Sequence, residues 1–156
     1  MIDKDNYILV LNGLNLTGIL ESWMWLTGAD KSIVALTKSG DMLLKDSFGK
    51  LYFLDTGGGN LEMVANNFAD FLENNLSDGQ MDELLLPNLI DKLTVDGILL
   101  EPGQVYSYLI LPILGGPYDS SNMYPLEAYE HYSLTGEMHH KIKDFPDGKH
   151  VRINVQ

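Results

Sequence analysis

No cysteine occurs in the 156 residues, which excludes disulfide bonds, a thiolate nucleophile and a cysteine-ligated zinc site. Long apolar runs are missing too, because no window approaches the roughly 20 residues that a membrane helix requires. The chain opens with acidic residues where a secretory signal carries lysine or arginine. We therefore expect a cytoplasmic protein that does not enter a membrane.

Basic residues are almost absent from the middle of the chain. Residues 51–140 contain fourteen acidic residues and a single base, Lys92, within a net charge of −12 for the whole sequence. The negative electrostatic potential around such a chain disfavours binding to nucleic acid or anionic lipid and speeds the approach of a basic partner. Acidity that serves solubility alone is the alternative interpretation.

The first half of the chain has the pattern of an antiparallel sheet. An apolar content of 45% over this length fits one domain, residues 1–156. Short apolar runs, separated by turns that contain glycine, occupy residues 31–37, 41–45, 51–55 and 60–65. Runs of this length and spacing predict a four-stranded meander.

Helical spacing follows the predicted meander. It predicts one amphipathic helix from Ala65 to Leu76 and a second from Ser77 to Leu93, kinked or split at Pro87. The remaining expected elements are a helix near 14–25, a short strand at 98–101, an apolar run over 105–114, a helix over 126–142 and a strand over 151–155. Strands, then helices, then strands and a helix again favour an α+β fold with three to four helices.

One short motif raises the possibility of catalysis. Residues 53–59, FLDTGGG, contain the hydrophobic-Asp-Thr-Gly signature of aspartic proteases, centred on Asp55. Gly58 stands where those enzymes carry alanine or serine, and helical sequence follows where they continue in β-structure. We favour a glycine-rich turn after a strand.

The histidines are concentrated at one end of the chain. His131, His139, His140 and His150 all lie in the last 26 residues. No His-x-x-x-His or His-Glu-x-x-His spacing occurs, and His139 and His140 diverge by about 100° on a helix. We expect surface or core-edge histidines, and neither a metal ion nor another cofactor.

Residues 109–122, LILPILGGPYDSSN, begin as apolar as a core strand and end as polar as a loop. We interpret Leu109–Leu114 as a core strand, after which Gly115 and Gly116 let the backbone turn sharply. Tyr118 and Asp119 then stand on an exposed loop as candidate partner contacts.

Several blocks, in this order, resemble the C-terminal domain of type VI secretion DNase-immunity proteins. They are LESWMWLTGAD (20–30), SGDMLLKDSFGKLYFLDTGGGNLEMVANNFADF (39–71), LLEPGQVYSYLILPILGGPYDSSN (99–122) and EHYSLTGEMHHKIKDFPDG (130–148). That domain is distantly similar to the SUKH-type immunity folds. Longer members of the family carry an additional N-terminal module similar to a GAD-like domain, for which 156 residues leave no room.

The resemblance implies an immunity protein, which is an antitoxin and not an enzyme, that neutralises a cognate protein toxin from neighbouring cells. If the toxin is a nuclease, its groove is basic and an acidic surface speeds association. The contacts expected on this interpretation are Asp70, Glu73, Asp78, Asp82, Glu83, Tyr118 and Asp119. Two alternatives stay open: a small hydrolase or metal-dependent enzyme that uses Asp55 or the histidines, and a SUKH-like scaffold that binds another regulatory protein.

Overall fold

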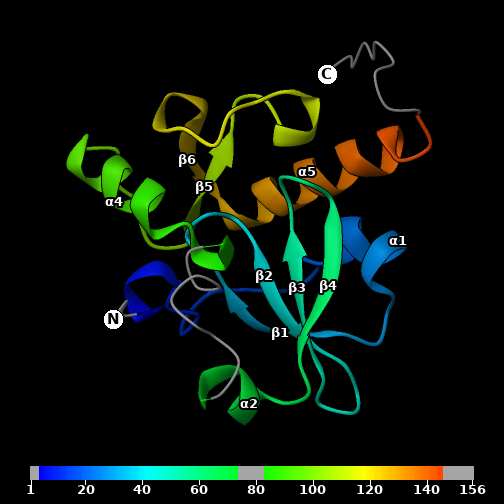
Figure 1. The fold of residues 1–156 in the computed structure, drawn as a ribbon. Coiled ribbons are helices and arrows are strands. Elements are labelled where there is room, and N and C mark those ends of the chain that lie inside the picture. The colour runs from blue at the N-terminus through cyan, green and yellow to red at the C-terminus, as the bar shows by residue number, and fades with distance from the viewer. Residues whose placement is uncertain (1–3, 74–82, 146–156) are drawn as a thin grey trace.

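Two antiparallel sheets and the helices around them make up the computed structural model, which describes residues 4–73 and 83–145 (Figure 1). In chain order, the first half contains η1 (Lys4–Tyr7), η2 (Glu21–Trp23), α1 (Met24–Thr27), β1 (Ser32–Leu36), β2 (Met42–Lys45), β3 (Leu51–Asp55) and β4 (Asn60–Ala65). The second half contains α2 (Phe68–Glu73), α4 (Pro87–Val95), β5 (Gln104–Tyr108), η3 (Pro112–Leu114), η4 (Ser120–Asn122), β6 (Met123–Glu127) and α5 (Ala128–Ile142). The α+β prediction is confirmed.

The predicted meander is present as the sheet β1-β2-β3-β4, in which each strand pairs antiparallel with the next. Successive side chains point to opposite faces of a strand, so an apolar run buries both faces of the sheet. Met42 and Leu44 belong to the core on one face, whereas Leu43 and Phe53 belong to a second cluster with Phe71 on the other. Burial on both faces explains why β2 and β3 lack the polar alternation of a half-exposed sheet.

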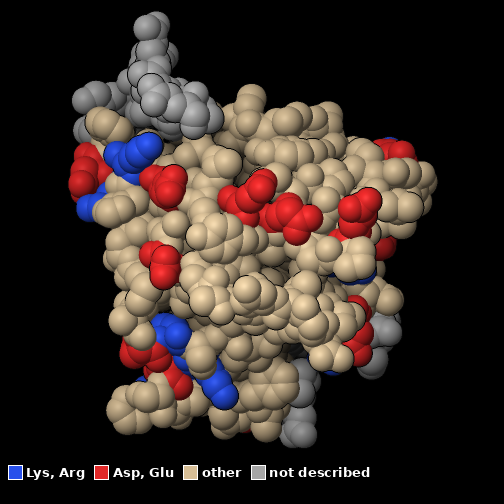
Figure 2. All heavy atoms as spheres, turned by 180° about the vertical axis from the view of Figure 1, so that it is seen from behind, with Lys and Arg blue, Asp and Glu red and all other residues tan. Residues whose placement is uncertain are grey.

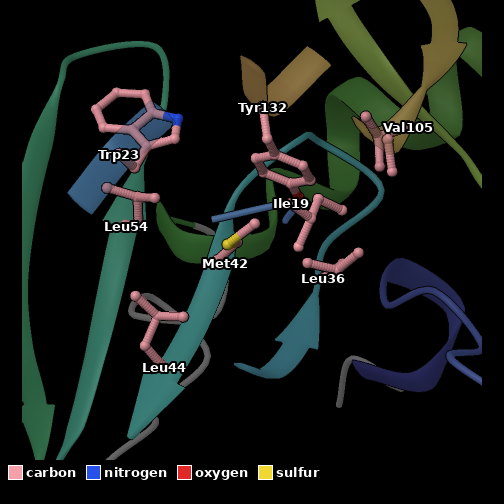
Figure 3. Packing of buried hydrophobic residues seen from close by; sticks show 9 residues of the cluster. Ile19, Trp23, Leu36, Met42, Leu44, Leu54, Val105 and Tyr132 are labelled. Atoms are coloured by element: carbon pink, nitrogen blue, oxygen red, sulfur yellow. The ribbon is translucent and has the colours of Figure 1, made fainter. Parts of the chain in front are cut away.

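The main core lies between the meander, the N-terminal segment and α5 (Figure 3). Trp23, Leu36, Met42, Leu54 and Tyr132 are buried there, and the figure shows their side chains converging from different elements. At roughly 25 cal/mol for each Å² of apolar surface removed from water, a few such side chains contribute several kcal/mol.

Strands β5 and β6 form the second sheet and lead directly into α5. The sheet is tied to the meander through the amide of Tyr106, which donates to the Lys38 carbonyl at 2.8 Å. Helix α5 then crosses behind the meander and packs on η2 (Figure 1). The two backbones approach closely at Gly136, where a Cβ would lie 2.5 Å from the Ser22 carbonyl oxygen.

Two of the helix predictions need correction, and a third is confirmed. Residues 14–25 form no continuous helix, because Gly13 and Gly18 adopt positive φ (86° and 74°) and break the segment into turns before η2 and α1. The first amphipathic helix starts only at Phe68, since Ala65 ends β4. The predicted split at Pro87 is confirmed: Pro87 is the first residue of α4, and Leu86 before it has φ 49°. Ser77, Gln80 and Leu76 lie outside the described residues.

The strand predictions in the second half also change. Residues 98–101 form no strand, whereas β6 (Met123–Glu127) was not predicted. Pro125 hides β6 from sequence patterns, and the structure accommodates it because β6 pairs only with β5 on one side. The predicted strand at 151–155 lies outside the described residues. Among the helices that the structure describes, none is long and apolar enough to cross a bilayer.

Candidate partner-binding surface

The segment after β5 is a tightly held loop, and the prediction of a core strand over Leu109–Leu114 is wrong. Strand β5 ends at Tyr108, and residues 112–114 form the 3₁₀ turn η3. Pro112 lacks the N–H that would continue the ladder, and it starts the turn instead. We call residues 109–118 the apolar loop.

Asn122 holds the apolar loop through hydrogen bonds to the loop's backbone. Its Oδ1 accepts from the amide of Ile110 (2.9 Å), and its Nδ2 donates to the carbonyls of Ile110 (2.8 Å) and Pro117 (3.0 Å). The Asn122 carbonyl also accepts from the amide of Leu109 at 2.8 Å. Asn122 is itself buried, and its three side-chain bonds hold the backbone of the loop at Ile110 and Pro117.

The two glycines of the loop are structural, as the sequence interpretation favoured. Gly115 closes η3 at φ 98°, a region that side chains disfavour. A Cβ on Gly116 would overlap the carbonyl oxygen of Ile110. The amide of Ile113 donates to the Gly57 carbonyl (3.3 Å), which joins the loop to the glycine-rich turn between β3 and β4.

Apolar side chains project from this fixed backbone into solvent. Leu111 is buried, but Leu109 (65%), Ile110 (53%), Ile113 (52%) and Tyr118 (50%) are at least half exposed, and Leu114 is also exposed. Single apolar residues scattered over a surface are normal, whereas several on one short loop make the loop a candidate interaction site. Side chains on a preorganised backbone lose little entropy when a partner binds.

An acidic pocket of about 380 Å³ opens beside the apolar loop and shares Tyr118 with it. Its walls combine carboxylates with apolar groups from β3, β4, the apolar loop, the turn before β2 and the segment that leads into α4. The lining residues are Asp41, Phe53, Asp55, Glu62, Glu83, Leu84, Leu86 and Tyr118.

Asp41, next to this pocket, is almost completely buried. Its Oδ1 accepts from the amide of Thr56 (2.9 Å) and from the Thr56 hydroxyl (3.2 Å), while Ser39 donates to Oδ2 at 3.3 Å. Burial, together with the negative charge of Asp55, raises the pKa of Asp41 to about 8 despite these bonds. Asp41 is therefore mostly a neutral acid at pH 7.

His131 contacts Gly40, the residue next to Asp41, and connects α5 to both sheets. Its Nε2 lies 2.8 Å from the Gly40 carbonyl, which only accepts, so Nε2 carries the proton and the Ser107 hydroxyl donates to Nδ1 (2.7 Å). Complete burial lowers the pKa of His131 to about 4. The residue is a neutral structural link, so its position in the core corrects the expectation of surface or core-edge histidines.

The other described histidines also have packing roles. His139 is buried, its Nε2 donates to the Thr56 carbonyl at 2.8 Å, and burial lowers its pKa. His140 is exposed and stacks on Trp25 with ring centroids 5.2 Å apart. Residues 4–73 and 83–145 contain no group of three or more side chains suited to hold a metal ion, and His150 lies outside them.

Asp55 of the Asp-Thr-Gly motif caps its own turn. Its Oδ1 accepts from the amides of Gly57 (3.0 Å) and Gly58 (3.1 Å), which is the hydrogen bonding of a turn residue. Gly59, at φ 73°, lies so close to His139 that a Cβ would overlap the imidazole ring. The favoured interpretation of a glycine-rich turn is confirmed.

The structure separates the residues predicted to meet a partner. Glu83 and Tyr118 come together at the pocket, whereas Asp70 lies on α2, at the opposite end of the molecule from the apolar loop (Figure 1). Asp119 caps η4 by accepting from the Ser121 amide, and bonds to Ser121 lower its pKa. Glu73 ends α2, with its side chain outside the described set, and Asp78 and Asp82 lie outside the described residues.

Sequence reasoning missed the apolar members of this surface, because an unbroken apolar run reads as a buried strand. Pro112 was the sequence signal against a strand, because a proline cannot continue the hydrogen-bond ladder of a sheet. On the face in Figure 2, acidic side chains outnumber basic ones and lie mostly apart among uncharged groups.

The fold and this surface together define an α+β protein that presents a fixed apolar loop beside an acidic pocket. Residues 65–139 match the family model described as "T6SS immunity protein Tdi1, C-terminal". The predicted resemblance to type VI secretion immunity proteins is therefore confirmed, and the matched segment includes the whole apolar loop.

A solved structure gives the same fold. The chain is similar to the crystal structure of Atu4351 from Agrobacterium tumefaciens, with a TM-score of 0.50 and 15% sequence identity. The similarity covers 80% of this chain but only 65% of that one, so the present chain spans about two thirds of its length. A comparison with curated proteins gave no match.

Proposed function

We propose that this protein is an immunity protein that binds a cognate type VI secretion toxin in the cytoplasm and neutralises it by blocking or distorting its active site. The observation that carries the proposal is the apolar loop, whose exposed side chains stand on a backbone fixed by Asn122. The family match over residues 65–139 supports a type VI secretion toxin as the class of partner.

The electrostatics favour a toxin with a basic active site, such as a nuclease. The whole chain carries a net charge of −12, and residues 51–140 contain one base against fourteen acids. A nuclease groove is lined with cations that neutralise phosphates. An acidic partner is attracted to that groove over a distance and competes with the nucleic acid for the same cations.

The proposed action requires no chemical step from this chain. Asp55 is engaged in a turn, and His131 and His139 are engaged in buried hydrogen bonds that join α5 to the sheets. These groups maintain the shape of the binding surface, so we expect neutralisation to depend on occupancy and not on turnover.

Co-expression with a candidate type VI secretion toxin, sought first in the adjacent reading frame, tests the proposal. We expect the chain to restore growth and to co-purify with the toxin. Titration of the purified toxin should then inactivate it at a ratio of one to one. Complete inactivation by a small fraction of an equivalent would show catalysis instead, and failure both to rescue growth and to co-purify would refute the proposed function.

A further inference from the structure

The acidic pocket beside the apolar loop is suited to bind one long side chain. Its volume is about 380 Å³. Phe53, Leu84 and Leu86 contribute apolar wall, and the half-exposed Tyr118 adds an aromatic ring. Such walls pack well against the methylene groups of a long basic side chain, whose charged end then needs acceptors.

The acceptors are present and lack a cation. Asp55, Glu62 and Glu83 line the pocket, and no lysine or arginine is among its lining residues. None of the ion pairs found in the described parts of the chain involves these three carboxylates. A pocket lined by three carboxylates and by no cation attracts a positively charged group in preference to a neutral or negative one.

A separate observation points to a missing hydrogen-bond partner next to the pocket. The hydroxyl of Tyr108 is buried and has no hydrogen-bond partner, which is costly for a polar group. It lies against Gly57 together with the hydroxyl of Tyr118, since a Cβ on Gly57 would be 3.2 Å from the first and 2.8 Å from the second. The unpaired hydroxyl of Tyr108 thus lies near that of Tyr118, which is a lining residue of the pocket.

We propose that this pocket binds an arginine side chain of the cognate toxin. Arginine fits better than lysine because its planar guanidinium offers five donors to acceptors in several directions and stacks on an aromatic ring. The inference rests on the proposed function and deepens it: the apolar loop provides contact area, while the pocket selects a toxin with arginine at the matching position. Arginines that bind phosphate are common in nuclease grooves, so an occupied pocket also removes a substrate contact from the toxin.

The first test compares two pairs of substitutions with the same change in charge. The pocket pair is Glu62→Gln with Glu83→Gln, and the control pair is Glu130→Gln with Glu137→Gln on the exposed face of α5. We expect the pocket pair to weaken binding to the catalytically inactive toxin about tenfold more than the control pair, which corresponds to about 1.4 kcal/mol. All four glutamates are exposed, so thermal melting should show intact folding for both variants.

The outcomes separate the two proposals. Equal loss of affinity in the two pairs would overturn the proposal that the pocket binds arginine and leave the proposed function intact. A wild-type chain that does not bind the toxin would overturn the proposed function.

The second test examines the pocket without the toxin. N-acetyl-arginine methylamide should shift the NMR amide signals of Gly57 and Gly58, which bond to Asp55, in the wild type more than in the pocket pair. The neutral citrulline analogue should leave those signals in place. Equal shifts from both compounds, or none from either, would overturn the arginine assignment.

Discussion

The substitution Asp41→Asn should change how the stability of this protein depends on pH. Asp41 has a pKa of about 8 in the folded chain, against 3.8 as the ordinary value, because burial and Asp55 disfavour its charge. Between those values the unfolded state is ionised and the folded state holds a proton, so the stability from Asp41 is lost as pH rises. Because folding is coupled to proton binding, the free energy of unfolding should fall by about 1.4 kcal/mol for each pH unit in this range.

The window from pH 6.5 to 8 isolates this effect. His131 has a pKa of about 4 when folded and 6.5 ordinarily, so it lowers stability only as pH falls below 6.5. From pH 6.5 to 8 the free energy of unfolding should therefore fall by about 2 kcal/mol in the wild type. For a chain of this size, that corresponds to a drop of about 4 to 8 °C in melting temperature.

Asparagine preserves the hydrogen bonds of the protonated acid while removing its titration. Its Oδ1 can accept from Thr56, and its Nδ2 can donate to Ser39. The charged or titratable groups near Asp41 are Asp55, Tyr108, Tyr118, Tyr132 and His131. The pKa values of the three tyrosines are raised and that of His131 is lowered, so these four groups do not titrate strongly between pH 6.5 and 8.

Urea denaturation, followed by tryptophan fluorescence at several pH values, measures the effect. The Asp41→Asn variant should be nearly flat from pH 6.5 to 8 and should lose stability below pH 6.5, where the titration of His131 is no longer offset by that of Asp41. Asp144→Asn is the matched control, because its side chain is 85% exposed. Parallel curves for the wild type and Asp41→Asn between pH 6.5 and 8 would refute the reasoning.

The remaining stability predictions concern the turn and the loop. Gly59→Ala should destabilise the fold by at least about 1 kcal/mol more than Gly49→Ala in urea denaturation. Both residues have positive φ, but only Gly59 packs against His139. Equal destabilisation by the two substitutions would show that the close contact with His139 does not set the cost. Asn122→Ala should cost about 2 to 3 kcal/mol, because it removes three hydrogen bonds to the backbone of the apolar loop, and amide hydrogen exchange at Ile110 should speed up. Unchanged exchange at Ile110 would show that Asn122 does not hold the loop.

The sequence was sufficient for the meander because its signals are local. The runs at β2 and β3 are separated by turns with glycine at positions such as Gly49, where φ is 85°. The start of α4 was also predictable, because a proline is tolerated at the first position of a helix but not inside one. Where a short segment determines its own structure, the prediction and the structure agree.

The candidate surface depends on contacts between distant parts of the chain, which no short pattern records. His131 meets Gly40 across 91 residues, and Asp41 meets Thr56 across 15. The exposure of Leu109 and Ile113 depends on η3, and η3 is joined to the Gly57 turn of the other sheet. The sequence predicted a partner and an acidic chain, but only the tertiary structure distinguishes the apolar residues that face solvent from Leu111, which does not.

The affinity of an apolar-loop variant for the toxin tests the central claim most directly. Leu109→Ser combined with Ile113→Ser removes two exposed side chains without touching the bonds of Asn122, and Phe48→Ser, at a site 86% exposed on the β2–β3 turn, is the control. We predict that the dissociation constant of the complex with inactive toxin rises about a hundredfold for the loop variant, or about 2.7 kcal/mol, and stays unchanged for Phe48→Ser. Wild-type affinity in the loop variant would contradict the account.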